Sequence, residues 1–272
     1  MWWLALLACT SDPVETDDTT VIGAYSVDVR TDPEQPIAGE TTEVWLTVNG
    51  PDGEPVPDLQ QTHERMIHTF AISKDLAWFS HPHQEDFEPV TGEDLQNATF
   101  HFPLEFPAGG DAFLAFNFAH RNEYLRSAAW LNITGEPAQL DAPLFDFATT
   151  TQEVEGLTIT WVWDDQKGAG EQSVWHLEIL EGDQPVTDIG LWLASDGHIA
   201  VVSEDLASVG HTHAYVPGME DVPPGHEMPH TYDGPELPFR YVFPTAGSYR
   251  VWTQFARTGQ DPVTVAFDIQ VP

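Results

Sequence analysis

The sequence predicts an all-β protein made of two tandem immunoglobulin-like antiparallel β-sandwich domains related by internal duplication. The first observation is a repeat: residues 55–83 align without a gap on residues 185–213, with ten of 29 positions identical. Self-similarity at a fixed offset indicates a duplicated unit. The second observation is that short runs of alternating apolar and polar residues are separated by Gly, Pro, Asp and Asn clusters, with no heptads or long helical periodicity. Strands spaced in this way are typical of β-sandwiches.

Six runs carry the strand prediction most clearly, three in each half of the chain. They are Tyr25–Arg30, Glu43–Val48, Phe113–Phe118, Leu157–Trp163, Tyr249–Phe255 and Val263–Val271. The Phe-Pro segments 106–110 and 243–247 occupy matching places in the two halves. Both resemble the turn that enters a late strand of an immunoglobulin-like sandwich.

Length and linker composition set the expected domain boundaries. A chain of 272 residues accommodates two domains of roughly 110–125 residues, each with its own core. We expect a signal peptide at 1–8, an acidic tether at 9–20, a first sandwich at 21–135, a linker at 136–150 and a second sandwich at 151–272.

The charge is strongly acidic, with 44 Asp and Glu against 9 Lys and Arg and a net charge of −35. Such a chain repels nucleic acids and anionic membrane surfaces, so we expect neither as a partner. The same field attracts cations of every kind without creating a specific site. Solubility or adaptation to salt is the simplest explanation of the excess charge.

Cys9 is the only cysteine, which rules out a disulfide within the chain. It follows the apolar stretch Met1–Ala8, which is too short to span a bilayer. The sequence Leu6–Cys9 resembles the lipobox of bacterial lipoproteins. That resemblance implies cleavage before Cys9, a lipid anchor on Cys9, and a location in the bacterial cell envelope facing the periplasm or the exterior. An uncleaved apolar N-terminus is the alternative.

A histidine pattern, H-x12-H-x-H, occurs once in each half. Its residues are His68, His81 and His83, then His198, His211 and His213. A hairpin that turns at residues 73–76 would place the first two histidines of each set opposite one another, with the third two residues further on the same face. Three imidazoles would then converge within reach of metal–nitrogen bonds of about 2.0–2.1 Å. Each half is therefore predicted to hold a metal site.

The second half has a longer loop after this hairpin, which contains His226, Met228 and His230. Imidazole and thioether ligands together favour copper, with zinc as the second choice. We therefore expect the second site to be the fuller one and the first to be weaker or vestigial. Alternatively, this is a Pro-rich surface loop with incidental His and Met residues. Four further histidines lack a histidine counterpart in the other repeat and receive no role: His63, His101, His120 and His176.

The motif around these histidines resembles that of a family of bacterial extracytoplasmic β-sandwich domains, some of them associated with copper handling. Its pattern is H-x-x-V-V-S-x-D-L-x(4)-H-x-H, then F-P-x-A-G and W-x-Q-F. The second half matches it at residues 198–213, 243–247 and 252–255. The first half departs from it at residues 71–72 and 115–118. The resemblance implies an extracytoplasmic β-sandwich and, weakly, a copper-related role.

Taken together, these features predict a non-enzymatic, membrane-anchored metal-binding protein that sequesters copper or delivers it to an unidentified protein partner. This hypothesis expects the histidines of each set to be close together and accessible to solvent. A cell-surface binding or scaffold module is the alternative, with histidines that are buried and hydrogen-bonded to the backbone. A metallohydrolase or oxidase ranks last, because G-x-S-x-G, H-E-x-x-H and phosphate-loop motifs are absent from the sequence.

Overall fold

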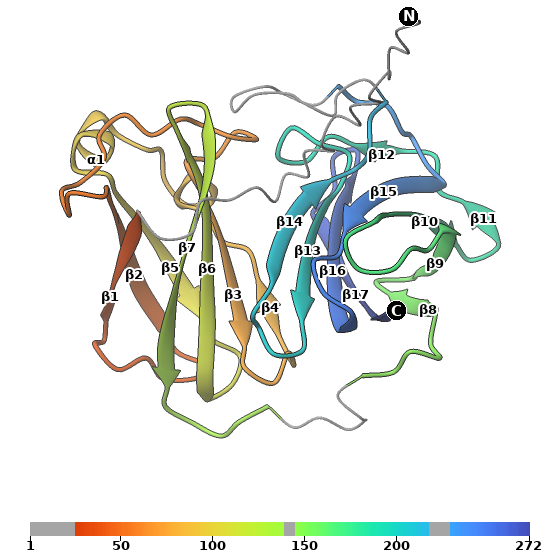
Figure 1. Cartoon of the computed structure of the whole chain (residues 1–272), viewed down its shortest axis with the longest axis horizontal. Helices are drawn as coiled ribbons and strands as arrows, with labels where there is room; N and C mark the ends of the chain where they lie inside the picture. Colours follow the sequence, from red (N-terminus) through yellow and green to blue (C-terminus); the bar gives the residue numbers. More distant parts are fainter. Residues whose placement is uncertain (1–24, 139–144, 218–228) are drawn as a thin grey trace, which may run out of the picture.

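The computed structural model describes residues 25–138, 145–217 and 229–272, which form two antiparallel β-sandwiches lying side by side (Figure 1). The predicted fold class is therefore confirmed. Each of the six predicted strand runs lies within an observed strand, except that Tyr25 precedes β1 by one residue. Among the described residues, no helix has the length and apolar character needed to cross a membrane.

The first sandwich consists of a three-stranded sheet, in the order β1-β2-β5, and a four-stranded sheet, in the order β4-β3-β6-β7. Two short helices, η1 and α1, lie between β4 and β5. The elements are β1 (Ser26–Asp32), β2 (Thr41–Asn49), β3 (Ile67–Ser73), β4 (Phe79–Ser80), η1 (Gln84–Asp86), α1 (Gly92–Asn97), β5 (Thr99–Glu105), β6 (Gly110–His120) and β7 (Glu123–Ile133).

The second sandwich repeats this plan with two five-stranded sheets. One has the order β11-β10-β9-β8 with β15 also paired to β10, and the other has the order β12-β16-β13-β14 with β17 also paired to β16. The strands are β8 (Thr151–Val154), β9 (Leu157–Asp165), β10 (Gln172–Glu181), β11 (Gln184–Pro185), β12 (Ile189–Gly190), β13 (His198–Ser203), β14 (Val209–His213), β15 (Glu236–Val242), β16 (Gly247–Arg257) and β17 (Pro262–Val271).

Strands β3 and β13 are buried along their whole length. On β3, Ile67 and Ala71 enter the core of the first sandwich, whereas Phe70 and Ile72 enter a third apolar cluster shared by both sandwiches. On β13, Ala200 and Val202 join the same cluster. The sheets that carry the two histidine sets therefore pack against each other, and one face of each strand is covered by the other domain.

The interface between the sandwiches combines apolar packing with polar contacts. The Trp252 ring is 5% exposed and stacks on Phe79 with ring centroids 5.2 Å apart. Arg250 is held by Asp268 through a 2.7 Å bond from Nε, and its Nη1 donates a 2.5 Å hydrogen bond to the carbonyl of Leu76. The two domains are thus docked against each other.

The predicted hairpin register is wrong by two residues. His198 pairs with His213, and Ile72 pairs with Phe79. The reason is a longer turn: the Ser73 N–H bonds to the Trp78 carbonyl, and the Ser73 Oγ accepts the N–H of Ala77 at 2.8 Å. Because side chains alternate with a period of two, a shift of two residues keeps every histidine on its predicted face.

Candidate metal centre

Each histidine set forms a compact group of side chains. We call His68, His81 and His83 the first centre, and His198, His211 and His213 the second centre. In each centre, one ring nitrogen from each histidine lies within 4.8 Å of the others. Both centres lie on the faces of β3 and β13 that meet between the domains. The predicted convergence of three imidazoles in each repeat is confirmed.

The nitrogens of the first centre form a nearly equilateral triangle. His68 Nδ1 lies 3.2 Å from both His81 Nε2 and His83 Nε2, and these two atoms are 3.0 Å apart. A tetrahedral ion with metal–nitrogen bonds of about 2.0–2.1 Å would hold its ligand nitrogens roughly 3.3–3.4 Å apart. The triangle is therefore close to the size that one ion requires.

In the first centre, each histidine has an inner nitrogen, which faces the other two histidines, and an outer nitrogen, which faces away from them. The hydrogen bonds of the outer nitrogens determine which inner nitrogens carry lone pairs. Each outer nitrogen lies against an oxygen that accepts a hydrogen bond. The pairs are His68 Nε2 with the Thr62 carbonyl at 3.0 Å, His81 Nδ1 with Gln254 Oε1 at 2.9 Å, and His83 Nδ1 with Asp86 Oδ2 at 2.8 Å. A neutral imidazole has one N–H, so these contacts place the hydrogen on the outer nitrogen. All three inner nitrogens then present lone pairs to one another.

In the second centre, the hydrogen bonds assign the inner nitrogen of His198. His198 Nε2 donates to the Trp192 carbonyl at 2.9 Å, which leaves its Nδ1 as a lone pair 3.3 Å from His211 Nε2. His213 Nε2 is buried and has no hydrogen-bond partner. The second centre therefore has one assigned inner lone pair, on His198, and one buried nitrogen without a partner, on His213.

Burial keeps these imidazoles neutral. His68, His83 and His198 are each 1% exposed, because the two sheets cover them. Burial lowers the pKa of His68 to about 4, and burial together with neighbouring imidazoles lowers the pKa of His211 well below its usual value. The expectation that the histidines are accessible to solvent is therefore wrong. The prediction assumed that each hairpin faces solvent, whereas the other domain covers it.

We expect metal affinity to be nearly independent of pH between about pH 8 and 6. Ordinary histidines bind protons near pH 6.5 and then lose metal, whereas a ligand with a pKa near 4 remains unprotonated until the pH falls much lower. Affinity should decline as the pH drops from about 5 through 4. Competition with a chromophoric chelator at several pH values measures this. A tenfold loss between pH 7 and 6 would contradict it.

The two centres adjoin across the interface. The ring centroids of His68 and His211 are 5.0 Å apart, and those of His81 and His211 are 5.8 Å apart. Gln254, on β16 of the second domain, supplies the oxygen that orients His81 of the first. The Gln254 Nε2 donates in turn to Thr264 Oγ1 at 3.0 Å, which fixes the amide. The first centre therefore has a full set of oriented ligands.

Of the remaining predicted ligands, the structure describes only His230. His226 and Met228 lie outside the described residues, as does Cys9. His230 is exposed, with its Nδ1 2.6 Å from Asp196 and its Nε2 3.0 Å from Asp233. The hydrogen bonds to Asp196 and then to Asp233 raise its pKa. Both of its nitrogens are therefore engaged by carboxylates, and His230 belongs to neither group of converging nitrogens.

His63 is a residue of the site that sequence reasoning missed. It lies in the loop before β3, and its ring stacks on His213 of the second domain with a centroid distance of 3.7 Å. Its Nδ1 is buried and has no hydrogen-bond partner. The repeat pattern did not identify His63, because Leu193 occupies the equivalent position in the second half.

The chain is distantly similar to several solved structures. A putative membrane-anchored protein from Corynebacterium diphtheriae is 14% identical with a TM-score of 0.24, and the match covers 92% of this chain and 59% of that protein. Latent PorU from Porphyromonas gingivalis is 9% identical with a TM-score of 0.28, and the match covers 93% of this chain and 21% of PorU. The Escherichia coli adhesin FdeC is 12% identical with a TM-score of 0.24, and the match covers 90% of this chain and 64% of the adhesin. The chain thus spans less than two thirds of each of these structures.

No curated protein matches the chain. A family model, described as a domain of unknown function (DUF8832), matches it twice, at residues 19–135 and 152–272. The two matches correspond to the two sandwiches and together cover most of the sequence. The chain therefore belongs to the DUF8832 family, with two copies of the domain in tandem.

Proposed function

We propose that this protein binds and retains a transition-metal ion, with copper as first choice and zinc as second, at each of the two histidine centres. The observation that carries the proposal is the inward orientation of the lone pairs in the first centre. Three buried acceptor nitrogens meet there, and their outer nitrogens all face acceptor oxygens. A cation is the partner that satisfies three converging lone pairs at once.

A purely structural role explains this arrangement less well. Buried polar atoms without a partner cost about 1–3 kcal/mol each, so packed histidines normally pair an N–H with a lone pair. His68 and His198 do bond to backbone carbonyls, as the scaffold alternative expects. Metal-bound histidines make the same contact, since their second nitrogen usually donates to a carbonyl or carboxylate. The backbone bonds therefore fit both functions, whereas the converging lone pairs favour a metal.

The donor set supports copper before other metals. Imidazole ligands suit zinc, copper, iron and nickel, and among divalent ions the affinity order peaks at Cu²⁺. Each described centre supplies three imidazole nitrogens and one open position for a further ligand. The thioether of Met228, which lies outside the described residues, is not needed for this preference.

Burial favours sequestration over rapid delivery. An ion at the first centre would lie among side chains of which His68 and His83 are 1% exposed, so release requires the covering domain to move. We propose a binding protein and not an enzyme, held in the bacterial cell envelope by lipid on Cys9. Mass spectrometry of the mature N-terminus tests the anchor, and an unmodified chain that begins at Met1 would contradict it.

Calorimetric titration of the full chain with Cu²⁺ and with Zn²⁺ tests the metal function. At about 0.5 M salt, exposed charges are screened beyond roughly 4 Å, which suppresses binding to the acidic surface. We expect two tight ions per chain that excess Ca²⁺ does not displace, since Ca²⁺ prefers oxygen ligands. Weak binding without a defined stoichiometry, abolished by salt or Ca²⁺, would assign the affinity to the surface carboxylates.

A further inference from the structure

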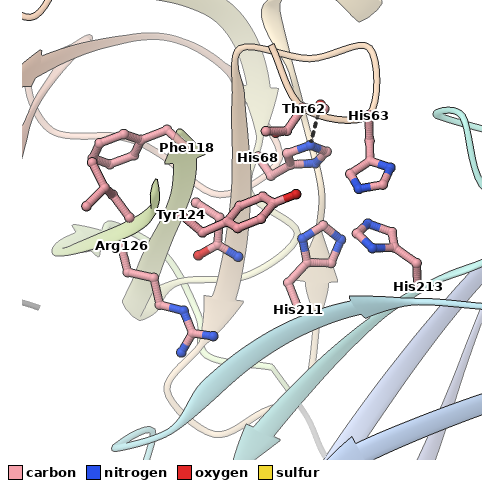
Figure 2. Close-up of a pocket in the computed structure, with 10 residues that line it drawn as sticks. Thr62, His63, His68, Phe118, Tyr124, Arg126, His211 and His213 are labelled. Carbon is pink, nitrogen blue, oxygen red and sulfur yellow. Dashed lines mark hydrogen bonds between the residues drawn. The ribbon is translucent and has the colours of Figure 1, made fainter. Parts of the chain in front are cut away.

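A small cavity lies beside the second centre, between the two domains. Its volume is about 30 Å³, and it is lined by His63 and His68 of the first domain and by His211 and His213 of the second. Figure 2 shows these four rings drawn together around it. A cavity needs about 10–15 Å³ to hold one water molecule, so this one admits a ligand the size of water or slightly larger.

The cavity adjoins a three-histidine centre. Three protein ligands leave a tetrahedral ion with one open position, which a water molecule or another small ligand normally occupies. Two ligands of the second centre, His211 and His213, line the cavity. An ion bound there would have a space of suitable size beside two of its three ligands.

His63 supplies a polar atom at this place. Its Nδ1 is buried without a partner, and its ring is 3.7 Å from that of His213 and 5.9 Å from that of His198. Its backbone is left-handed, with φ of 46°, and Leu193 at the equivalent position of the second repeat has φ of 50°. The loop therefore takes this shape with either side chain, so the backbone does not require histidine at residue 63.

We propose that the second centre binds an exogenous water-sized ligand in this cavity, either water, hydroxide or a small monodentate anion, and that His63 of the first domain holds it by a hydrogen bond. This inference rests on the proposed metal function and adds a ligand to it. The metal binds the ligand, and the unpartnered Nδ1 of His63 orients the ligand through a hydrogen bond. Leucine, which occupies the equivalent place in the other repeat, has no such group.

The test uses azide as the probe and copper as the metal. Protein carrying His81→Ala and His83→Ala retains the second centre and keeps His68 on the cavity wall. Loaded with Cu²⁺, it should bind azide, which the azide-to-copper charge-transfer absorption reports. Adding His63→Leu should weaken azide binding about tenfold or more, as expected for loss of a hydrogen bond to a charged ligand. His63→Asn, which keeps a hydrogen-bonding group, should lose less.

A matched control isolates the second centre. In protein with His211→Ala and His213→Ala, only the first centre loads, and His63→Leu should leave its azide affinity within about twofold. Copper that binds the second centre but takes up no azide, or azide affinity unchanged by His63→Leu, would overturn this inference and leave the metal function standing. Failure of the parent protein to bind copper at all would overturn both.

Discussion

Replacing His198, His211 and His213 together with alanine should reduce the number of tightly bound ions from two to one. The substitutions remove all three inward nitrogens of the second centre and leave the first intact. Changes to residues that merely orient metal ligands cost roughly 10–100-fold in affinity, so loss of the ligands themselves should cost at least about 100-fold. Calorimetric stoichiometry measures the result.

The control for this triple variant is His176→Ala. His176 lies on β10, away from both centres, with its Nδ1 3.0 Å from both carboxylate oxygens of Asp164. Its removal should leave both ions in place. Two tight ions in the triple variant, with unfolding as cooperative as in the parent, would exclude the second centre as a binding site.

Replacing Trp252 with alanine should lower the free energy of unfolding by about 3–5 kcal/mol, the usual cost of truncating a buried large aromatic side chain. Trp252 is 5% exposed and stacks on Phe79 of the other domain at an interplanar angle of 14°. Its loss opens the centre of the interface. Copper should consequently dissociate faster from both centres, because the domains that cover them separate more often.

Chemical denaturation and chelator-induced release measure the two effects of Trp252→Ala. Trp130→Ala provides the comparison, because Trp130 is 51% exposed and removing it should change stability by about 0.5 kcal/mol or less. If both variants unfold at the same denaturant concentration, Trp252 does not stabilise the docked domains. If copper leaves both at the same rate, docking does not control retention.

The sequence predicted the strands and the histidine groups because both depend on local periodicity. Alternating apolar residues identified β9 and β17, and the repeated spacing identified the six histidines. The register error of two residues arose from the four-residue turn after Ser73, in which Leu76 is left-handed with φ of 56°. Turn geometry sets the register, and an apolar pattern alone does not determine it.

The sequence also contained an unused signal for the interface. In β3, Phe70 and Ile72 are apolar on the same face as His68, although the opposite face already fills the sandwich core. A strand that is apolar on both faces is typically covered on both. The position of His63 was harder to infer, since its contact with His213 depends on how the two domains dock.

The hydrogen bond from His81 to Gln254 would couple ion binding at the first centre to domain docking. Gln254 holds His81 in place only while the two sandwiches are together. Whatever factor docking adds to the affinity of the first centre, a bound ion must add to the strength of docking. A bound ion would therefore hold the two sandwiches together, and separating them would weaken its binding by the same factor. Asn117 occupies the corresponding position in the first repeat; it is one methylene shorter and lines the cavity with His211, so the two repeats differ at this contact.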